Sequence, residues 1–127
     1  MTERTAIRTD DAPAALGPYN QAIAHAGLLW CAGQVPIDPA TGKLVEGDAA
    51  DQARRSLENL RAVCAAAGTD LSRALRCGIF LTDLGDFQLV NEAYATFFEG
   101  APPARSTVQV AGLPAGARVE IEAVVAL

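Results

Sequence analysis

The feature that most constrains the fold of this chain is a change in the spacing of its hydrophobic residues after Asp48. Beyond that point, apolar residues recur at steps of four and three and form one stripe: Ala53, Leu57, Leu60, Cys64 and Ala67. This spacing predicts an amphipathic helix, with Asp48 as its N-cap and Gly68 directly after its last turn. A helix with a single apolar stripe has to pack that stripe against a second layer.

A second helix is predicted in residues 86–98, where Asp86 can cap the N-terminus. Its core face would contain Val90, Ala93, Tyr94, Phe97 and Phe98. Gly100 and the pair Pro102–Pro103 end this helix, because proline cannot continue one. The segments with strand character are residues 5–9, 21–33 (two strands that turn at Ala26–Gly27), 73–83, 105–112 and 117–127. Residues 34–47 contain turn dipeptides and are predicted to be a loop.

The predicted order of elements is therefore β-β-β-α-β-α-β-β. We expect an α+β fold, a two-layer sandwich in which a mixed β-sheet carries two helices on one face. A length of 127 residues fits a single domain over residues 1–127. The other face of the sheet has no helix left to cover it, so that face decides what the chain can bind.

Composition excludes several classes of function. The formal net charge of -5 disfavours nucleic acid and anionic membranes as partners. His25 is the only histidine, and Cys31, Cys64 and Cys77 have no ligand spacing, so neither a metal site nor a His-based triad is expected. The thiols are expected to be buried and reduced. The first residues lack the apolar segment of a signal peptide, and we expect a cytoplasmic protein.

The last two strands are predicted to form a hairpin around residues 113–116. Because side chains alternate along a strand, two sets arise. The set expected to pack on the helices is Ser106, Val108, Val110, Val119, Ile121, Ala123 and Val125. The set expected on the uncovered face is Arg105, Thr107, Gln109, Arg118, Glu120 and Glu122, beside Trp30 and Cys31. With the turn centred on Pro114–Ala115, Arg105 lies opposite Val124 and Gln109 opposite Glu120, which separates Arg105 from Glu120 by about 13 Å.

Two interpretations of this polar face stay open. It is either a solvated sheet face, as on many antiparallel sheets, or a surface that another subunit covers. In the second case, Arg105 of one chain could approach Glu120 of the next. A guanidinium grips a carboxylate through two parallel hydrogen bonds, and a partly desolvated glutamate can relay a proton. Tyr19 and Gly33, next to turns, could supply a ring wall and a close approach of the backbone. Such a site suits hydration of an activated C=N bond.

Five blocks of the sequence resemble the YjgF/RidA/UK-type family of small trimeric proteins. The C-terminal block, "PARSTVQVAGLPAGARVEIEAV", is similar to the signature of that family. The other blocks, in the same order as in the family, are "APAALGPYNQAI", "CAGQVPIDPATGKLV", "DQARRSLENL" and "FQLVNEAYATFF". The resemblance covers the chain from about Ala12 to its end.

The resemblance implies a chorismate-mutase-like fold, a homotrimer with clefts between subunits, and hydrolysis of enamines and imines such as 2-aminoacrylate to 2-keto acids and ammonia without a cofactor. It also implies that Arg105 holds the substrate carboxylate and that Glu120 positions water or moves a proton. The residues that match the cleft lining of the family are Tyr19, Gly33, Asn91 and Thr107.

The chain departs from the family pattern at Thr107, where deaminating members often have cysteine, and at Cys31, where serine or threonine is common. These departures bear on which imine is the substrate. The alternative to an enamine/imine deaminase is a carboxylate-binding or protein-interaction module of the same fold without catalysis. A ribonuclease or translation-inhibitor role, as attributed to some relatives, fits poorly with the acidic charge and the single histidine.

Overall fold

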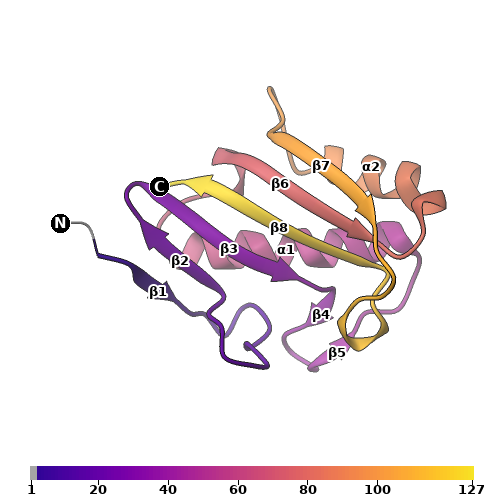
Figure 1. The fold of residues 1–127 in the computed structure, drawn as a ribbon, viewed down its shortest axis with the longest axis horizontal. Helices are drawn as coiled ribbons and strands as arrows, with labels where there is room; N and C mark the ends of the chain where they lie inside the picture. Colours follow the sequence, from indigo (N-terminus) through magenta and orange to yellow (C-terminus); the bar gives the residue numbers. More distant parts are fainter. Residues whose placement is uncertain (1–2) are drawn as a thin grey trace.

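The computed structural model describes residues 3–127, which build a six-stranded sheet with two helices on one face (Figure 1). The strands, in spatial order, are β1 (Thr5–Ile7), β2 (Ala22–His25), β3 (Leu28–Gln34), β8 (Val119–Ala126), β6 (Ala74–Leu81) and β7 (Ala104–Gln109). Neighbouring strands are antiparallel except β6 and β7, which run parallel. The helices are α1 (Ala49–Ala66) and α2 (Phe87–Ala95).

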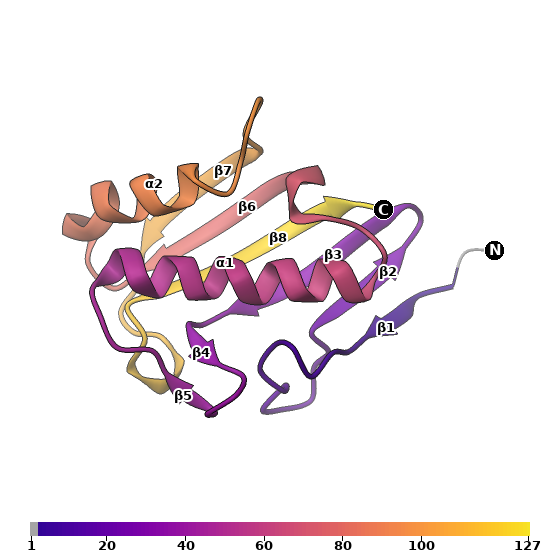
Figure 2. The same cartoon turned by 180° about the vertical axis from the view of Figure 1, so that it is seen from behind.

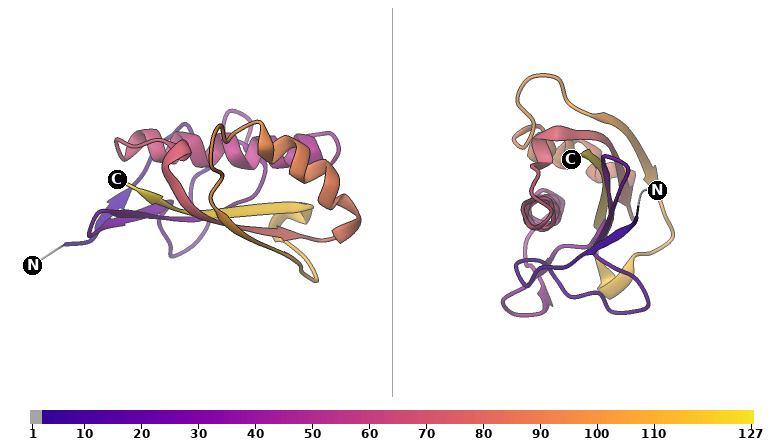
Figure 3. Two further views of the ribbon diagram at one scale, coloured as in Figure 1. Left: turned by 90° about the horizontal axis from the view of Figure 1, so that it is seen from above. Right: turned by 90° about the vertical axis from the view of Figure 1, so that its left-hand side faces the viewer.

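Both helices lie on the same side of the sheet, as the views from behind and from above show (Figures 2 and 3). This arrangement confirms the predicted α+β sandwich of a mixed sheet and two helices. Neither helix in the described residues 3–127 has the length and apolar character of a membrane span. The predicted loop 34–47 contains a small hairpin of β4 (Ile37–Asp38) and β5 (Lys43–Leu44).

Helix α1 forms as its sequence predicts. The Asp48 side chain accepts a hydrogen bond from the Asp51 backbone N–H at 3.0 Å, and the Asp51 carboxylate accepts one from the Asp48 N–H at 3.0 Å. These reciprocal bonds satisfy two backbone donors that would otherwise lack partners. Gly68 follows the last turn with a φ of 80°, a conformation in which a side chain would be strained. Leu57 and Leu60 on the apolar stripe are fully buried in the core.

Helix α2 begins differently from the prediction. Asp86 occupies the N-cap position but makes no capping hydrogen bond. A short 3₁₀ turn, Leu84–Asp86, runs directly into the helix, so Asp86 already has helical backbone angles. Its carboxylate instead accepts two hydrogen bonds from the Arg118 guanidinium, at 3.0 and 3.1 Å. The ion pair ties the start of α2 to the segment that leads into β8.

The predicted hairpin of the last two strands is wrong. Strand β8 lies in the middle of the sheet between β3 and β6, whereas β7 lies at the edge beside β6. The reason is that β6, α2 and β7 form a strand–helix–strand crossover, which places two strands side by side in parallel. Strand β8 then pairs on both of its sides. Its apolar residues Val119, Ile121, Ala123 and Val125 are buried under the helices, as predicted.

The register of β7 also reverses the predicted faces of that strand. Arg105 is paired with Cys77, and Thr107 with Ile79, and both partners are buried under the helices. Arg105 and Thr107 therefore point toward the helix layer instead of the uncovered face. Ser106 and Val108, which were expected to pack on the helices, are exposed instead.

Candidate functional site

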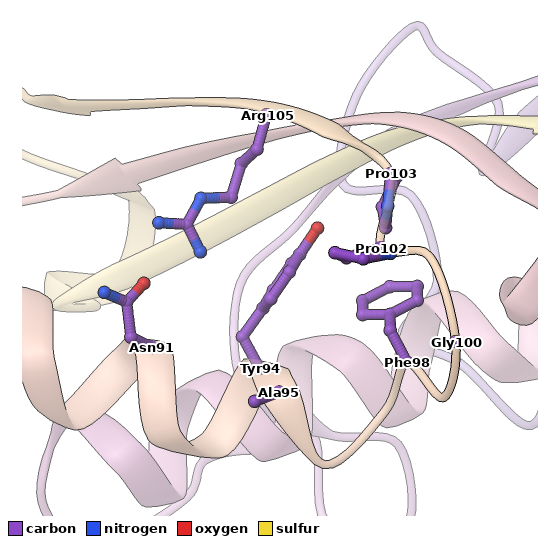
Figure 4. A pocket seen from close by; sticks show the side chains of 8 residues that line it. All are labelled: Asn91, Tyr94, Ala95, Phe98, Gly100, Pro102, Pro103 and Arg105. Carbon is purple, nitrogen blue, oxygen red and sulfur yellow. The ribbon is translucent and has the colours of Figure 1, made fainter.

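Arg105, the second residue of β7, projects into a pocket between that strand and α2 (Figure 4). Pro102 and Pro103 restrict the backbone just before the strand, because the ring of each proline fixes its φ angle. The cavity has a volume of about 350 Å³. The residues that line it are Asn91, Tyr94, Ala95, Phe98, Gly100, Pro102, Pro103 and Arg105. The pocket is thus largely apolar around one cationic group.

The Arg105 guanidinium is held by aromatic rings and not by an anion. Its central carbon lies 5.0 Å from the ring centre of Tyr94 and 5.5 Å from that of Phe87. Within residues 3–127, no carboxylate forms an ion pair with it and no group forms a hydrogen bond with it. Figure 4 shows the Asn91 amide directed to the same space. Five N–H donors on a partly buried cation therefore lack an acceptor among the described residues, an arrangement whose charge and geometry suit an anion.

Phe87 and Tyr94 were not among the predicted site residues. The helical pattern predicts Tyr94 as a core residue only. A signal for both does exist in the sequence, because Phe87, Asn91 and Tyr94 follow one another at steps of four and three. Residues at that spacing share one face of a helix.

Glu120 lies in a different pocket, with a volume of about 250 Å³. Tyr19 and Gly33 line the same pocket, so the structure brings together three of the predicted site residues. The other lining residues are Pro13, Ala14, Leu16, Gln21, Gln34, Val35, Ile37, Pro114 and Ala115. The glycine allows the close approach of Glu120, because a methyl group at Gly33 would come within 2.8 Å of the Glu120 carboxyl carbon. Only hydrogen at position 33 leaves the carboxylate where it is.

The environment of Glu120 favours the protonated carboxyl group. Partial burial removes water from the carboxylate and raises the pKa of Glu120 above its usual range, and the negative charge of Glu122 raises it further. Glu122 itself lies near Arg76, with 3.8 Å between the two charged groups. A glutamate with a raised pKa holds a transferred proton more readily than an ordinary carboxylate does, which suits it to exchange a proton with a bound reactant.

The two pockets lie on opposite faces of the sheet. Glu120 is paired with Phe80 on β6, whereas Arg105 is paired with Cys77 on the same strand. Residues an odd number of positions apart on a strand point to opposite sides. No residue lines both pockets, and Thr107 lines neither, with its hydroxyl buried and without a hydrogen-bond partner. One chain therefore does not bring Arg105 and Glu120 into one cavity.

The cysteines are buried and unpaired. Cys31 was expected on the uncovered face beside Trp30, but it lies under the helices and is 8% exposed, whereas Trp30 is 51% exposed on the other side. A hydrogen bond with the Cys64 thiol, together with burial, raises the pKa of Cys31. In the described part of the chain, no cluster of three or more His, Cys, Asp or Glu side chains is arranged to hold a metal ion.

Comparison with known proteins agrees with this architecture. The profile of the family described as Endoribonuclease L-PSP matches residues 9–127. Protein DfrA of Myxococcus xanthus is 57% identical over 123 residues, covering 95% of this chain and 94% of DfrA. The 2-iminobutanoate/2-iminopropanoate deaminase of Mus musculus is 46% identical over 121 residues, covering 95% of this chain and 90% of that protein.

A solved structure, E. coli TdcF with bound serine, superimposes with a TM-score of 0.92 at 40% identity, covering 97% of this chain and 98% of TdcF. A match over nearly the whole chain, in both sequence and fold, establishes the family. The chain belongs to the Endoribonuclease L-PSP family, also called the RidA/YjgF family.

Proposed function

We propose that this protein hydrolyses reactive imines of 2-amino acids, and enamines such as 2-aminoacrylate after their tautomerisation, to 2-keto acids and ammonia. The observation that carries the proposal is the Arg105 guanidinium, which lies in an apolar pocket without an anionic partner among residues 3–127. A partly buried cation without a counterion is costly, and a bound carboxylate would supply the missing charge. The substrate class that fits is a small molecule with one carboxylate next to a reactive carbon.

The names of relatives support this assignment. The mouse relative is a 2-iminobutanoate/2-iminopropanoate deaminase, and both compounds carry a carboxylate beside a C=N bond. TdcF was solved with serine, which also carries a carboxylate. The family description names an endoribonuclease, but a net charge of -5 disfavours binding of the polyanionic RNA backbone.

We further propose that the working unit is a homotrimer with its sites between subunits. Arg105 and Asn91 would come from one chain, and Glu120, Tyr19 and Gly33 from its neighbour. The placement of Arg105 and Glu120 on opposite faces supports this division, because only a second chain can bring such groups together. Thr107 would act beside Arg105, through its backbone. A monomer in size-exclusion chromatography with light scattering, at micromolar concentration, would contradict the shared site.

In this site, Arg105 holds the carboxylate and so fixes the C=N carbon for attack. The Glu120 carboxylate accepts a proton from water while the water oxygen bonds to that carbon, and it passes this proton to the nitrogen to give a neutral carbinolamine. Glu120 then accepts the hydroxyl proton of the carbinolamine and delivers it to the nitrogen, so that the C–N bond breaks, the C=O bond forms and ammonia leaves. The sum is imine plus water giving 2-keto acid plus ammonia. This balance requires no oxidant or reductant, and we propose a cofactor-free reaction.

The test generates an imine with an amino-acid oxidase and traps it with semicarbazide. Wild-type protein is expected to suppress semicarbazone formation and to accelerate release of keto acid. Arg105→Ala should lower kcat/KM by at least about thirtyfold, because hydrogen bonds to a charged group are lost. Arg105→Lys should be nearly as poor, since an ammonium lacks the planar fork. The matched control is Arg54→Ala, which removes an exposed arginine of α1 and should behave as wild type.

Two results would redirect the proposal. Wild-type protein that binds 2-oxobutanoate but leaves semicarbazone formation unchanged with several imino acids would favour a carboxylate-binding module without catalysis. Full activity of Arg105→Lys would refute the carboxylate fork.

A further inference from the structure

Tyr94 stands directly against the arginine of the proposed site. Its ring centre is 5.0 Å from the central carbon of the Arg105 guanidinium, closer than that of Phe87 at 5.5 Å. Figure 4 shows the ring between Arg105 and Phe98, with its hydroxyl directed away from the guanidinium. The rings of Tyr94 and Phe98 pack with their centres 4.7 Å apart, so Phe98 supports the Tyr94 ring on the side away from Arg105. A ring that is fixed by packing and attracts a cation limits the positions of that cation, here the Arg105 guanidinium.

The hydroxyl of Tyr94 does not explain why an aromatic residue is placed here. Tyr94 is 4% exposed, and its hydroxyl oxygen is buried without a well-formed hydrogen bond. Burial and the neighbouring Cys77 thiol raise the pKa of this hydroxyl, so it stays neutral. A buried, neutral hydroxyl that water does not reach is poorly placed to act on a substrate. The ring face is the part of Tyr94 that meets a functional group.

We propose that Tyr94 is a positioning residue whose ring face holds the Arg105 guanidinium in the pocket and so sets the affinity for the substrate carboxylate. This role rests on the proposed function, and it assigns to Tyr94 an effect exerted through Arg105. Without the Tyr94 ring, only the more distant ring of Phe87 faces the guanidinium, because within residues 3–127 it makes no ion pair. The free arginine would sample several rotamers, and binding would have to order it again.

An effect on carboxylate binding alone predicts a particular kinetic pattern. Ground state and transition state both carry the carboxylate, so loss of its anchor weakens both alike. Tyr94→Leu should therefore raise KM about tenfold, within the range of a cation–π contact shielded from water, and leave kcat within about twofold. Tyr94→Phe keeps the ring and should retain the wild-type KM. A general loss of folded protein would lower the apparent kcat instead.

The chain offers a matched control in Phe97. The central carbon of the Arg61 guanidinium lies 4.6 Å from the ring centre of Phe97. Phe97→Leu therefore removes a similar contact three residues after Tyr94, at a position outside the pocket. This variant should keep the wild-type KM. If Tyr94→Leu fails to fold, Phe87→Leu tests the same principle, that a ring against Arg105 sets KM, because Phe87 is 40% exposed and its ring also faces Arg105. Its expected effect is a rise in KM of about threefold.

Two measurements separate this inference from the proposed function. The first is the dissociation constant of 2-oxobutanoate, which should rise about tenfold in Tyr94→Leu alongside KM. The second is the Arg105 side-chain Nε–H resonance, assigned by its absence in Arg105→Lys and shifted by the ring current of Tyr94. That resonance should keep its position in Tyr94→Phe and move toward that of an exposed arginine in Tyr94→Leu.

Each outcome is decisive. An unchanged resonance and unchanged KM in Tyr94→Leu would overturn the positioning role while leaving the deaminase proposal intact. A wild-type protein that neither binds 2-oxobutanoate nor hydrolyses imines would overturn the proposed function, and the resonance would still decide whether Tyr94 holds Arg105. A raised KM in both Tyr94→Leu and Tyr94→Phe would assign the effect to the hydroxyl and refute the role of the ring face.

Discussion

The glycine at position 33 offers a sharp test of whether Glu120 must occupy its observed place. A methyl group in Gly33→Ala would lie 2.8 Å from the Glu120 carboxyl carbon, 2.9 Å from one carboxylate oxygen and 3.1 Å from Cγ. Ordinary van der Waals contacts begin at 3.4 Å, so the carboxylate has to move by at least several tenths of an ångström. The obstructing atoms belong to the end of a flexible side chain, so the movement costs little stability.

The expected result is a change in activity without a change in stability. A displacement approaching 1 Å at a proton-transfer group costs up to about a hundredfold, and we expect kcat of Gly33→Ala to fall about tenfold to a hundredfold. The free energy of unfolding should change by less than about 1 kcal/mol, because alanine also restricts the unfolded chain. Semicarbazide-trapping kinetics and thermal unfolding measure the two quantities.

Gly112→Ala is the matched control, since a methyl group there meets no atom within 4 Å. It should leave kcat unchanged. Wild-type kcat in Gly33→Ala would refute the argument that Glu120 has to lie against this glycine to act. A large loss of stability would also refute it, because the clash would then fall on the backbone and not on a movable carboxylate.

Two further predictions concern stability and pH. Asn59 is fully buried, and its side-chain amide donates hydrogen bonds to the backbone carbonyls of Val35 and Ile37 at 3.3 and 3.0 Å. Asn59→Ala removes both hydrogen bonds and should lower the free energy of unfolding by about 3 kcal/mol in denaturant titrations. A loss below about 1 kcal/mol would contradict this. The negative charge of Glu122 adds to the raised pKa of Glu120, so Glu122→Gln should lower the pKa of Glu120. The acid limb of the pH profile of kcat/KM should then move to lower pH. A shift to higher pH would contradict this effect of Glu122.

The candidate site shows how far sequence reasoning reaches. The pattern of family blocks indicated the residues, and the structure gathers Tyr19, Gly33 and Glu120 in one pocket and Asn91 and Arg105 in another. The division between two chains was inferred from the distance between Arg105 and Glu120 within a hairpin that does not exist. The structure shows instead that the two residues lie on opposite faces of the sheet, and the proposed division between chains now rests on that observation.

Local patterns in the sequence determined those elements whose signals lie within a few residues. The stripe after Asp48 specified α1 together with its caps, and Ala26–Gly27, both with positive φ, specified the turn between β2 and β3. The alternation from Val119 to Val125 specified which residues of β8 share a buried face. Each of these signals is a short-range consequence of helical or strand periodicity.

Only the tertiary structure decided which strands are neighbours and which way each polar face points. Alternation shows that Arg105 and Thr107 share a face, but not whether that face meets helices or solvent. The answer depends on α2, which carries the chain across so that β7 pairs in parallel with β6 and leaves the central position to β8. The same packing sets the ring of Tyr94 against Arg105. Pairing of this kind joins residues far apart in sequence, and its free energy comes from burial of the whole sheet face.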